Sequence, residues 1–318
     1  MKAIVSTKYG SPDALQLKEV DKPIPKEDEA LVKVHAASLN AADFENLRKP
    51  MYKNKILGSD VAGRVEAVGR NVKQFLPGDE IWGDLSVHGF GTFAEYVCIP
   101  EKALRLKPVS MTFEDAAAIP SAAVVALQNL RDKRPIQPGQ KVLINGAGGG
   151  VGTFAVQLAK YFGAEVTGVD STRKLDMLRS IGANHVIDYT QEDFTKNGQY
   201  YDLILDVVVH RSIFDYMHAL SPKGTCVFVG GSMTRVFLNV LLGQLISITG
   251  SKKMGLVMWK PNKKEDLDFL QKLFEAGKVV PVIDRHYPLS EVPEALRYLE
   301  EGHAQGKVII TVDHNNKT

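Results

Sequence analysis

The spacing of apolar residues predicts a strand, a turn, a helix and a second strand between residues 141 and 170. Residues 142–144 form an apolar run that is too brief for a helix and rich enough in branched side chains for a buried strand. Apolar residues then recur at helical spacing up to Gly163, which suits the left-handed residue that closes many helices. Glu165–Asp170 is a second apolar strand, and it ends in a carboxylate.

Small residues fill the turn between the first strand and the helix. A glycine there removes the Cβ that would block a pyrophosphate, and free N–H groups of the next helix receive its charge. Asp170 follows Gly152 by 18 residues, which is close to the spacing of a dinucleotide-binding unit, although Ala147 replaces one glycine of the strict pattern. The alternative is a tight turn that binds nothing. We predict contacts with a dinucleotide at Gly148, Gly149, Gly150 and Val151.

The rest of the chain divides into a β-rich part and a part in which strands and helices alternate. Residues 1–116 contain short apolar strands separated by prolines and glycines, which favours a compact antiparallel barrel. The alternation that follows favours a parallel, doubly wound sheet. A last strand at 308–312 comes after two helices and fits back into the first domain. The prediction is an α/β protein in which one domain, 121–259, interrupts another, formed by 1–120 and 260–318.

Composition and charge narrow the class of protein. The 318 residues are 44% hydrophobic and 24% charged, with a net charge of +2, so nothing favours nucleic acid or a membrane as a partner. The apolar run 236–250 is interrupted by Asn239 and Gln244 and is too short to cross a bilayer. The only cysteines, Cys98 and Cys226, lie in apolar runs and predict buried, reduced thiols. Because the start of the chain has no secretory segment, we expect a cytoplasmic protein.

Several motifs resemble those of the medium-chain dehydrogenase/reductase superfamily. They are the glycine-rich strand at 58–69, Pro77-Gly78-Asp79, the turn at 146–152 and Gly306-Lys307-Val308. Within this superfamily, the stretches 37–43, 145–152 and 171–173 resemble the zinc-independent quinone oxidoreductase branch, of the zeta-crystallin kind. The resemblance covers essentially the whole chain. It implies a GroES-like β-barrel catalytic domain split around a Rossmann domain, with the active site in the cleft.

The resemblance bears directly on metal binding. Zinc-dependent relatives hold a catalytic metal with side chains at three places, which are occupied here by Asn40, Ser59 and Ser121. None of these is a good zinc ligand, and the carboxylate of Asp60 cannot hold the ion alone. Two cysteines are also too few for a four-thiolate structural site. We therefore expect a protein without zinc.

The expected absence of a metal favours one class of acceptor. Oxidation of an alcohol would lose its usual means of stabilising an alkoxide, whereas a quinone or an α,β-unsaturated carbonyl is already electrophilic. We predict NAD(P)H-dependent hydride transfer to such a small molecule. The resemblance puts Asn40 at the nicotinamide side of the cleft, and Tyr52 is a candidate donor to the substrate oxygen. The alternatives are a helix-capping asparagine and a surface tyrosine.

Two other functions stay open at this point. One is a zinc-free alcohol or aldehyde oxidoreductase, and the other is a non-catalytic NADPH-binding sensor or scaffold. Stoichiometric NADPH binding without oxidation by any acceptor would favour the second.

The end of the second strand carries conflicting signals on cofactor choice. Asp170 suits the ribose hydroxyls of NAD and repels a 2′-phosphate. Residues suited to a phosphate follow directly, namely Ser171, Thr172, Arg173 and Lys174. Tyr189 resembles a residue that NADPH-using relatives place near that phosphate. We favour NADPH and keep NADH open, and the alternative for Arg173 and Lys174 is a solvated first helical turn.

The resemblance also implies a nicotinamide site and a mode of assembly. The family places the nicotinamide amide against the backbone at the end of the fifth strand, here Gly230 and Gly231, where a plain turn is the alternative. Relatives dimerise through the edge strand, and the apolar stretch 236–245 exceeds what one sheet face needs. We expect a homodimer, and burial of that stretch under the domain's own loops is the alternative.

Overall fold

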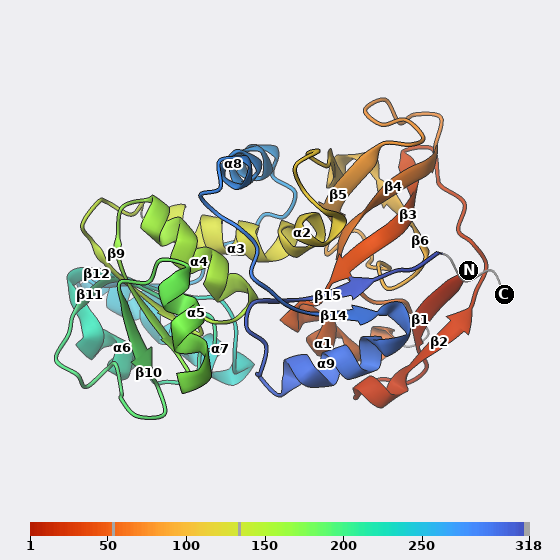
Figure 1. Cartoon of the computed structure of the whole chain (residues 1–318). Helices are drawn as coiled ribbons and strands as arrows, with labels where there is room; N and C mark the ends of the chain where they lie inside the picture. Colours follow the sequence, from red (N-terminus) through yellow and green to blue (C-terminus); the bar gives the residue numbers. More distant parts are fainter. Residues whose placement is uncertain (53–54, 133–134, 315–318) are drawn as a thin grey trace. The chain divides into compact units, whose positions relative to one another are not determined.

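The computed structural model describes residues 1–52, 55–132 and 135–314, and the chain divides into two compact units (Figure 1). The first unit consists of Met1–Val124, Lys260–Glu275 and Pro281–Thr318, and the second of Val125–Trp259 and Ala276–Val280. The boundary predicted after residue 120 therefore falls slightly early. Residues 276–280 belong to the second unit, where the Gln157 amide exchanges two hydrogen bonds of 2.9 Å with the backbone of Val280.

The second unit is built on a sheet of six parallel strands. In chain order they are β8 (Lys141–Asn145), β9 (Glu165–Asp170), β10 (His185–Asp188), β11 (Tyr201–Asp206), β12 (Leu220–Phe228) and β13 (Lys253–Gly255). Their order across the sheet is β10-β9-β8-β11-β12-β13, so the chain runs outward on one side and then on the other. The predicted doubly wound sheet is confirmed. A ligand site is expected where the order reverses, at the carboxyl ends of β8 and β11.

Helices connect these strands, as the alternation in the sequence predicts. They are α4 (Gly150–Tyr161), α5 (Leu175–Ser180), α6 (Ile213–Ala219) and α7 (Met233–Thr249). Helix α4, labelled in Figure 1, buries every residue from Gly152 to Ala159 and contacts β8 and β9. Gly163 has a φ of +84°, the left-handed conformation that ends this helix.

The first unit contains a seven-stranded sheet and a separate antiparallel pair, β1 (Lys2–Ser6) and β2 (Leu15–Glu19). The seven strands are β3 (Glu29–Ser38), β4 (Asp60–Val68), β5 (Glu80–Asp84), β6 (Tyr96–Pro100), β7 (Leu104–Leu106), β14 (Ile283–Pro288) and β15 (Lys307–Thr311). Strand β15 pairs with β3, so the last strand returns to the N-terminal domain as predicted. The pairs of this sheet are antiparallel except β14 with β15.

Four helices belong to this first unit over their whole length, and an apolar core lies against the sheet. The helices are α1 (Ala41–Leu47), α2 (Phe113–Ala118), α8 (Lys264–Glu275) and α9 (Val292–Glu300). Val32, Val61 and Phe93 are fully buried in the core, and Leu296 of α9 joins the same cluster. The helical spacing of buried residues in α9 explains why the sequence pattern reveals this helix.

Some elements differ from their predicted bounds. The helix expected over 113–130 is two helices, α2 and α3 (Pro120–Arg131), because Pro120 has no N–H with which to continue the first one. Helix α7 extends beyond 236–245 at both ends, and β13 is shorter than the predicted strand. Strand β14 was not predicted, because none of its six residues is buried and it carries no apolar alternation.

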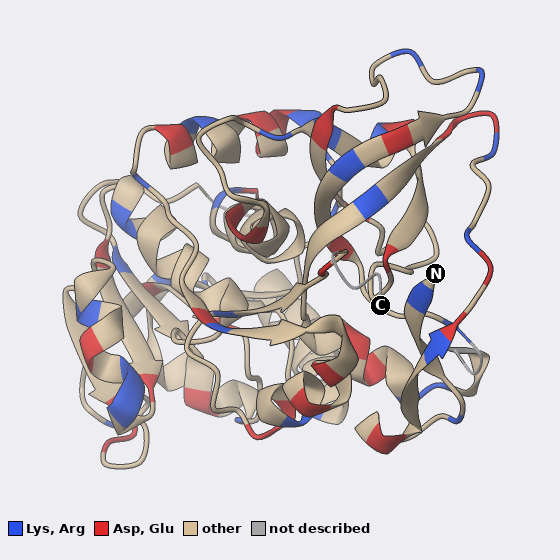
Figure 2. Ribbon diagram, turned by 45° about the vertical axis from the view of Figure 1, so that its right-hand side comes forward, with Lys and Arg blue, Asp and Glu red and all other residues tan. Residues whose placement is uncertain are grey.

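Charges of both signs are interspersed along the ribbon, in agreement with the small net charge (Figure 2). Within the described ranges, no helix combines the length and the apolarity needed to cross a membrane. Cys98 and Cys226 form no disulfide. Cys226 is buried as predicted, whereas Cys98 is only half-buried, and burial raises the pKa of its thiol to about 11.

Candidate functional site

The turn between β8 and α4 has the shape that a dinucleotide requires. A Cβ on Gly152 would lie 2.2 Å from the carbonyl oxygen of Gly146, so the helix approaches the turn more closely than any side chain permits. A Cβ on Gly149 would have its nearest neighbour at 3.6 Å, which leaves open space above the turn. The first N–H groups of α4, at Gly150 and Val151, start a helix and have no intrahelical acceptor. Open space beside free donors fits a pyrophosphate.

A buried polar network fixes the place where the strand order reverses. Asn145, at the end of β8, donates a hydrogen bond of 2.9 Å from Nδ2 to Asp206 at the end of β11. The Tyr216 hydroxyl donates to the same carboxylate at 2.7 Å, and its other oxygen accepts the N–H of Val208 at 2.9 Å. Burial raises the pKa of Asp206. Sequence reasoning missed this network, whose only local signal is a polar residue at each strand end.

Asp170 faces the glycine turn. Its Oδ2 accepts the N–H of Gly148 at 2.8 Å, its Oδ1 accepts the N–H of Ser171 at 2.9 Å, and the residue is only 7% exposed. The ammonium of Lys174 lies 3.4 Å from Oδ1. A Cβ on Gly148 would meet the Lys174 side chain at 2.6 Å, so this side chain covers the turn. The alternative of a solvated Lys174 is wrong, because the lysine is buried against a carboxylate four residues before it.

The other residues proposed for the cofactor phosphate lie at the ends of β9 and β10. Thr172 and Lys174 belong to a short 3-10 turn, η4 (Thr172–Lys174), and the Thr172 hydroxyl bonds the Asp188 carboxylate. Arg173 is exposed, and so is the Tyr189 side chain. The N–H of Tyr189 donates to the carbonyl of Asp170 at 3.2 Å, which brings the two strand ends together. Asp188, directly beside Asp170 in the sheet, was not considered in the sequence analysis.

Gly230 and Gly231 form the turn after β12. Gly231 has a φ of +108°, and a Cβ there would lie 2.4 Å from the backbone nitrogen of Val209. The Gly230 carbonyl accepts the N–H of Val209 at 2.9 Å, and the Ser232 N–H donates to the Val209 carbonyl at 2.9 Å. The close approach of the loop after β11 therefore requires glycine at position 231, whether or not a ligand contacts this turn.

Asn40, in the first unit, precedes α1 and joins two hydrogen-bond systems. Its backbone N–H donates to Oδ2 of Asp43 at 2.8 Å, which is the helix-capping arrangement. Its side-chain Nδ2 donates to Oδ2 of Asp60 at 2.9 Å, and its Oδ1 accepts from the Lys307 ammonium at 2.7 Å. Both interpretations of Asn40 are compatible with this geometry, because the backbone caps the helix while the amide lies in a polar cluster.

Asp60 is the centre of this polar cluster and is fully buried. Its Oδ1 accepts the N–H of Ser121 at 3.1 Å and the Ser121 hydroxyl at 2.6 Å. Its Oδ2 accepts the Ser38 hydroxyl at 3.1 Å and lies 3.7 Å from the Lys307 ammonium. Sequence reasoning noticed Asp60 but missed Lys307, although the Gly306-Lys307-Val308 motif was visible.

The polar cluster does not fit a divalent metal. The positions of the family's zinc ligands hold an amide and two hydroxyls, and an ammonium lies beside the nearest carboxylate. In the part of the chain that the structure describes, no three His, Cys, Asp or Glu side chains are grouped so as to hold an ion. A cation would have to displace the Lys307 ammonium to reach Asp60.

Two further buried carboxylates surround Asp60. Asp43 is fully buried, and burial raises the pKa of its carboxyl to about 7. Asp84 is 1% exposed and bonds Ser86, and burial raises its pKa to about 6. The Lys307 ammonium is the cation that faces these acids, and burial favours the protonated forms of Asp43 and Asp84.

Tyr52 closes the short helix η2 (Pro50–Tyr52), and its side chain lies outside the described residues. Its proposed contact with substrate therefore stays a prediction.

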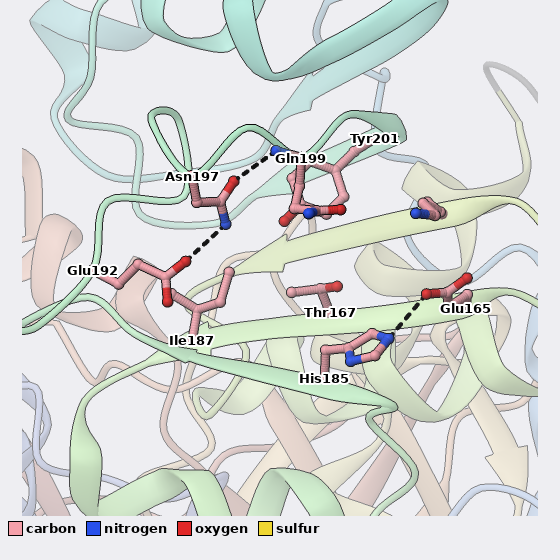
Figure 3. Close-up of a pocket in the computed structure, with 9 residues that line it drawn as sticks. Glu165, Thr167, His185, Ile187, Glu192, Asn197, Gln199 and Tyr201 are labelled. Atoms are coloured by element: carbon pink, nitrogen blue, oxygen red, sulfur yellow. Dashed lines mark hydrogen bonds and ion pairs between the residues drawn. The ribbon is translucent and has the colours of Figure 1, made fainter.

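A separate pocket of about 430 Å³ lies in the second unit (Figure 3). Its walls include an ion pair between His185 and Glu165 at 2.9 Å and a hydrogen bond from Asn197 to Glu192 at 2.9 Å. Lys141 and His185 are the first residues of their strands, whereas the glycine turn follows the last residue of β8. The pocket is thus at the opposite ends of the strands and is not the dinucleotide site.

The chain is similar to two described families and to characterised reductases. Residues 26–109 match the family described as "Alcohol dehydrogenase GroES-like domain", and residues 181–310 match "Zinc-binding dehydrogenase". A 2-methylene-furan-3-one reductase of Solanum lycopersicum is 37% identical, and an NADPH-dependent alkenal/one oxidoreductase of Arabidopsis thaliana, named as chloroplastic, is 34% identical. Each alignment covers 98% of this chain and 79% of the relative.

A solved structure extends the similarity to three dimensions. Escherichia coli quinone oxidoreductase complexed with NADPH matches with a TM-score of 0.89 at 26% identity, over 98% of this chain and 100% of that chain. The predicted fold class, a GroES-like domain with a Rossmann domain inserted, is confirmed. The chain belongs to the medium-chain dehydrogenase/reductase superfamily and is an oxidoreductase of its quinone oxidoreductase-like branch.

Proposed function

We propose that this protein transfers a hydride from NADPH to a quinone or an α,β-unsaturated carbonyl compound, without a metal. The observation that carries the proposal is the buried Lys307 ammonium, 3.7 Å from Asp60, among the positions where zinc-binding relatives hold their ion. An enzyme that lacks a Lewis acid needs an acceptor that is electrophilic by itself. The tomato and Arabidopsis relatives are named for unsaturated carbonyl substrates, which is the same class.

When bound, the reduced cofactor would supply a hydride, and hence two electrons, to the β-carbon of an enone or to a quinone. Negative charge would develop on the acceptor oxygen, and one proton from solvent would complete the saturated ketone or the hydroquinone. Asn40 contributes by donating a hydrogen bond to that oxygen while the charge develops. The glycine turn and the first N–H groups of α4 hold the pyrophosphate, which leaves the chemistry to the cofactor.

The contacts of Asp170 support NADPH over NADH. An aspartate that selects NAD must present its carboxylate to the ribose. In this protein both carboxylate oxygens accept backbone N–H groups, and Lys174 adds a positive charge at 3.4 Å. Much of the repulsion expected against a 2′-phosphate is therefore cancelled. Arg173 and Tyr189 are exposed at the same strand ends, and with Ser171 and Thr172 they complete the proposed phosphate site.

One experiment separates the candidate functions. Oxidation of NADPH and of NADH is measured with a benzoquinone, a naphthoquinone, an enone and an aldehyde, each with and without a chelator. We expect turnover with the quinones or the enone, faster with NADPH, and no effect of the chelator. Loss of activity on chelation would contradict the metal-free mechanism, turnover with the aldehyde alone would identify an aldehyde reductase, and binding without turnover would identify a sensor.

We further propose that the protein is a homodimer formed through β13 and α7. Strand β13 is the last strand of the sheet, so its outer edge is open to pairing with a second copy. Helix α7 exposes a row of large apolar side chains: Met233, Phe237, Leu238, Leu241, Leu242, Leu245 and Ile248. Such a face is larger than a monomer normally leaves in water. The alternative of burial under the domain's own loops is wrong for these seven side chains.

A cytoplasmic location completes the proposal. Neither cysteine forms a disulfide, which suits a reducing compartment. Fractionation of the source cells with an antibody would test it, and recovery with an organelle would contradict it.

A further inference from the structure

Lys307 is a buried cation with a complete set of partners. Its side chain is 2% exposed, and its ammonium donates to the carbonyl of Leu39 at 2.9 Å and to Oδ1 of Asn40 at 2.7 Å. Asp60 supplies the opposite charge at 3.7 Å. An ammonium only donates, and two hydrogen bonds and one ion pair hold this one on three sides. The lysine is therefore held in one place.

The ion pair fixes the Asn40 amide from both ends. Its oxygen accepts from the Lys307 ammonium, and its nitrogen donates to the Asp60 carboxylate at 2.9 Å. Because an ammonium only donates and a carboxylate only accepts, a flip of the amide would break both hydrogen bonds. One N–H of the amide serves Asp60, and the other has the Ser59 hydroxyl at the longer distance of 3.4 Å. This second N–H is the weakly engaged donor of the cluster.

We propose that Lys307 is a positioning residue for hydride transfer, because it holds the Asn40 amide in the one orientation that offers its second N–H to the acceptor oxygen. The inference rests on the role proposed above for Asn40. It assigns a function to a residue that sequence reasoning noted only as part of a family motif. If Lys307 were merely the counter-ion of Asp60, its removal would change stability and not the rate of the reaction.

A set of variants separates positioning from stability. Lys307→Met removes the charge and the donor to Asn40, and Asn40→Ala removes the amide. Lys307→Met combined with Asp60→Asn removes the ion pair as a whole, so that the carboxylate nearest to Lys307 is not left buried without its cation. Ser38→Ala is the matched control, because it deletes another hydrogen bond to Oδ2 of Asp60 and leaves Lys307 in place. Each variant is characterised by its Tm, its Kd for NADPH, and kcat and KM with a benzoquinone and an enone.

We expect Lys307→Met to lower kcat about 100- to 1,000-fold, the range for loss of a positioned donor, with the Kd for NADPH within about twofold of wild type. The primary isotope effect with NADPH deuterated at C4 should rise as hydride transfer becomes slower. Adding Asn40→Ala to Lys307→Met should lower kcat no further, because both changes remove the same hydrogen bond from the Asn40 amide to the acceptor oxygen. The double variant with Asp60→Asn should regain Tm but not kcat, and Ser38→Ala should lose Tm but keep kcat.

The outcomes distinguish this inference from the role of Asn40. If Asn40→Ala leaves kcat unchanged, the assignment of Asn40 fails, and the positioning role fails with it. If Asn40→Ala lowers kcat but the Lys307→Met, Asp60→Asn double variant recovers kcat together with Tm, only the positioning role is overturned. This double variant also carries the test if Lys307→Met alone does not fold, because it does not leave the Asp60 carboxylate without its cation.

Discussion

The ammonium of Lys174 lies 3.4 Å from Oδ1 of Asp170, in a pair that is buried beneath the glycine turn. The pair places a positive charge at the end of β9 and cancels the charge of the acid that would select NAD. We therefore expect the cofactor preference to depend on both residues together, and not on Asp170 alone.

Replacing Lys174 should therefore shift cofactor preference. We expect Lys174→Met to raise the Kd for NADPH about 10- to 100-fold, because Asp170 would then repel the 2′-phosphate without a cation beside it, and to change the Kd for NADH far less. Titration of protein fluorescence with each cofactor measures both constants. Arg179→Met is the control, because it removes an exposed cation of the neighbouring α5 that pairs with Asp176. Equal weakening of both cofactors would show that Lys174 supports the turn and does not offset the charge of Asp170 toward the 2′-phosphate.

Two glycines of the turn should respond differently to alanine. A Cβ at position 149 has open space in the protein, so Gly149→Ala should keep the wild-type Tm but raise the Kd for NADPH at least about tenfold by obstructing the pyrophosphate. A Cβ at position 152 would meet the Gly146 carbonyl at 2.2 Å, so Gly152→Ala should lower the free energy of unfolding by about 1–3 kcal/mol. Thermal melts and cofactor titrations check both. Normal NADPH binding by Gly149→Ala would contradict this site for the pyrophosphate.

The buried acids predict a pH-dependent stability. The pKa of Asp43 is about 7 in the folded protein and has an ordinary value of 3.8, so the folded state binds more protons between these values. Stability from this group is complete below its ordinary pKa and is lost as pH rises through about 7. From pH 5 to pH 8, wild type should lose roughly 2–3 kcal/mol relative to Asp43→Asn, which does not titrate.

Urea unfolding at several pH values measures this difference. Asp176→Asn is the control, because it changes a fully exposed carboxylate and should follow wild type. Asp84, with a pKa raised to about 6, contributes in the same direction and is removed separately with Asp84→Asn. A constant difference between wild type and Asp43→Asn across the range would rule out the raised pKa.

The exposed face of α7 predicts the oligomeric state. Light scattering should give twice the chain mass of 35.0 kDa for wild type, and the mass of one chain for Phe237→Asp or Leu241→Asp. The physical reason is that an unpaired carboxylate loses its hydration when it is buried in an apolar interface, and this free-energy cost opposes association. Val109→Asp is the control, because Val109 is a fully exposed apolar residue of the first unit. A monomeric wild type would exclude the proposed dimer.

Local patterns were sufficient to predict the dinucleotide-binding unit. The strand, the turn and α4 are adjacent in the chain, and their glycines and apolar spacing are dictated by contacts among neighbours. Strand β14 was not predicted, because none of its residues is buried and its sequence has no alternation of apolar and polar residues. Its pairing with β15 cannot be read from its own residues. The contacts of Asn40 were predicted only in part, since the hydrogen bond between Asn40 and Lys307 joins residues 267 positions apart.

The sequence also did not allow the directions of several side chains to be predicted. The sequence places Lys174 four residues after Asp170 but does not reveal that both side chains turn inward toward Gly148. Asp206 and Tyr216 likewise meet through packing of α6 on the sheet, which no local spacing specifies. For Tyr52 the side-chain position lies outside the described residues, so its role stays a prediction.

The pairing of β15 with β3 has a consequence for the order of events during synthesis. Residues 125–259 leave the ribosome as one continuous segment that holds all six strands of the nucleotide-binding sheet, and domains fold as units while the chain grows at about 5–20 residues per second. Asp60, by contrast, is synthesised early but pairs with Lys307, which lies in β15. Until β15 emerges, the Asp60 carboxylate lacks the Lys307 ammonium. The unit whose synthesis begins first is therefore completed last.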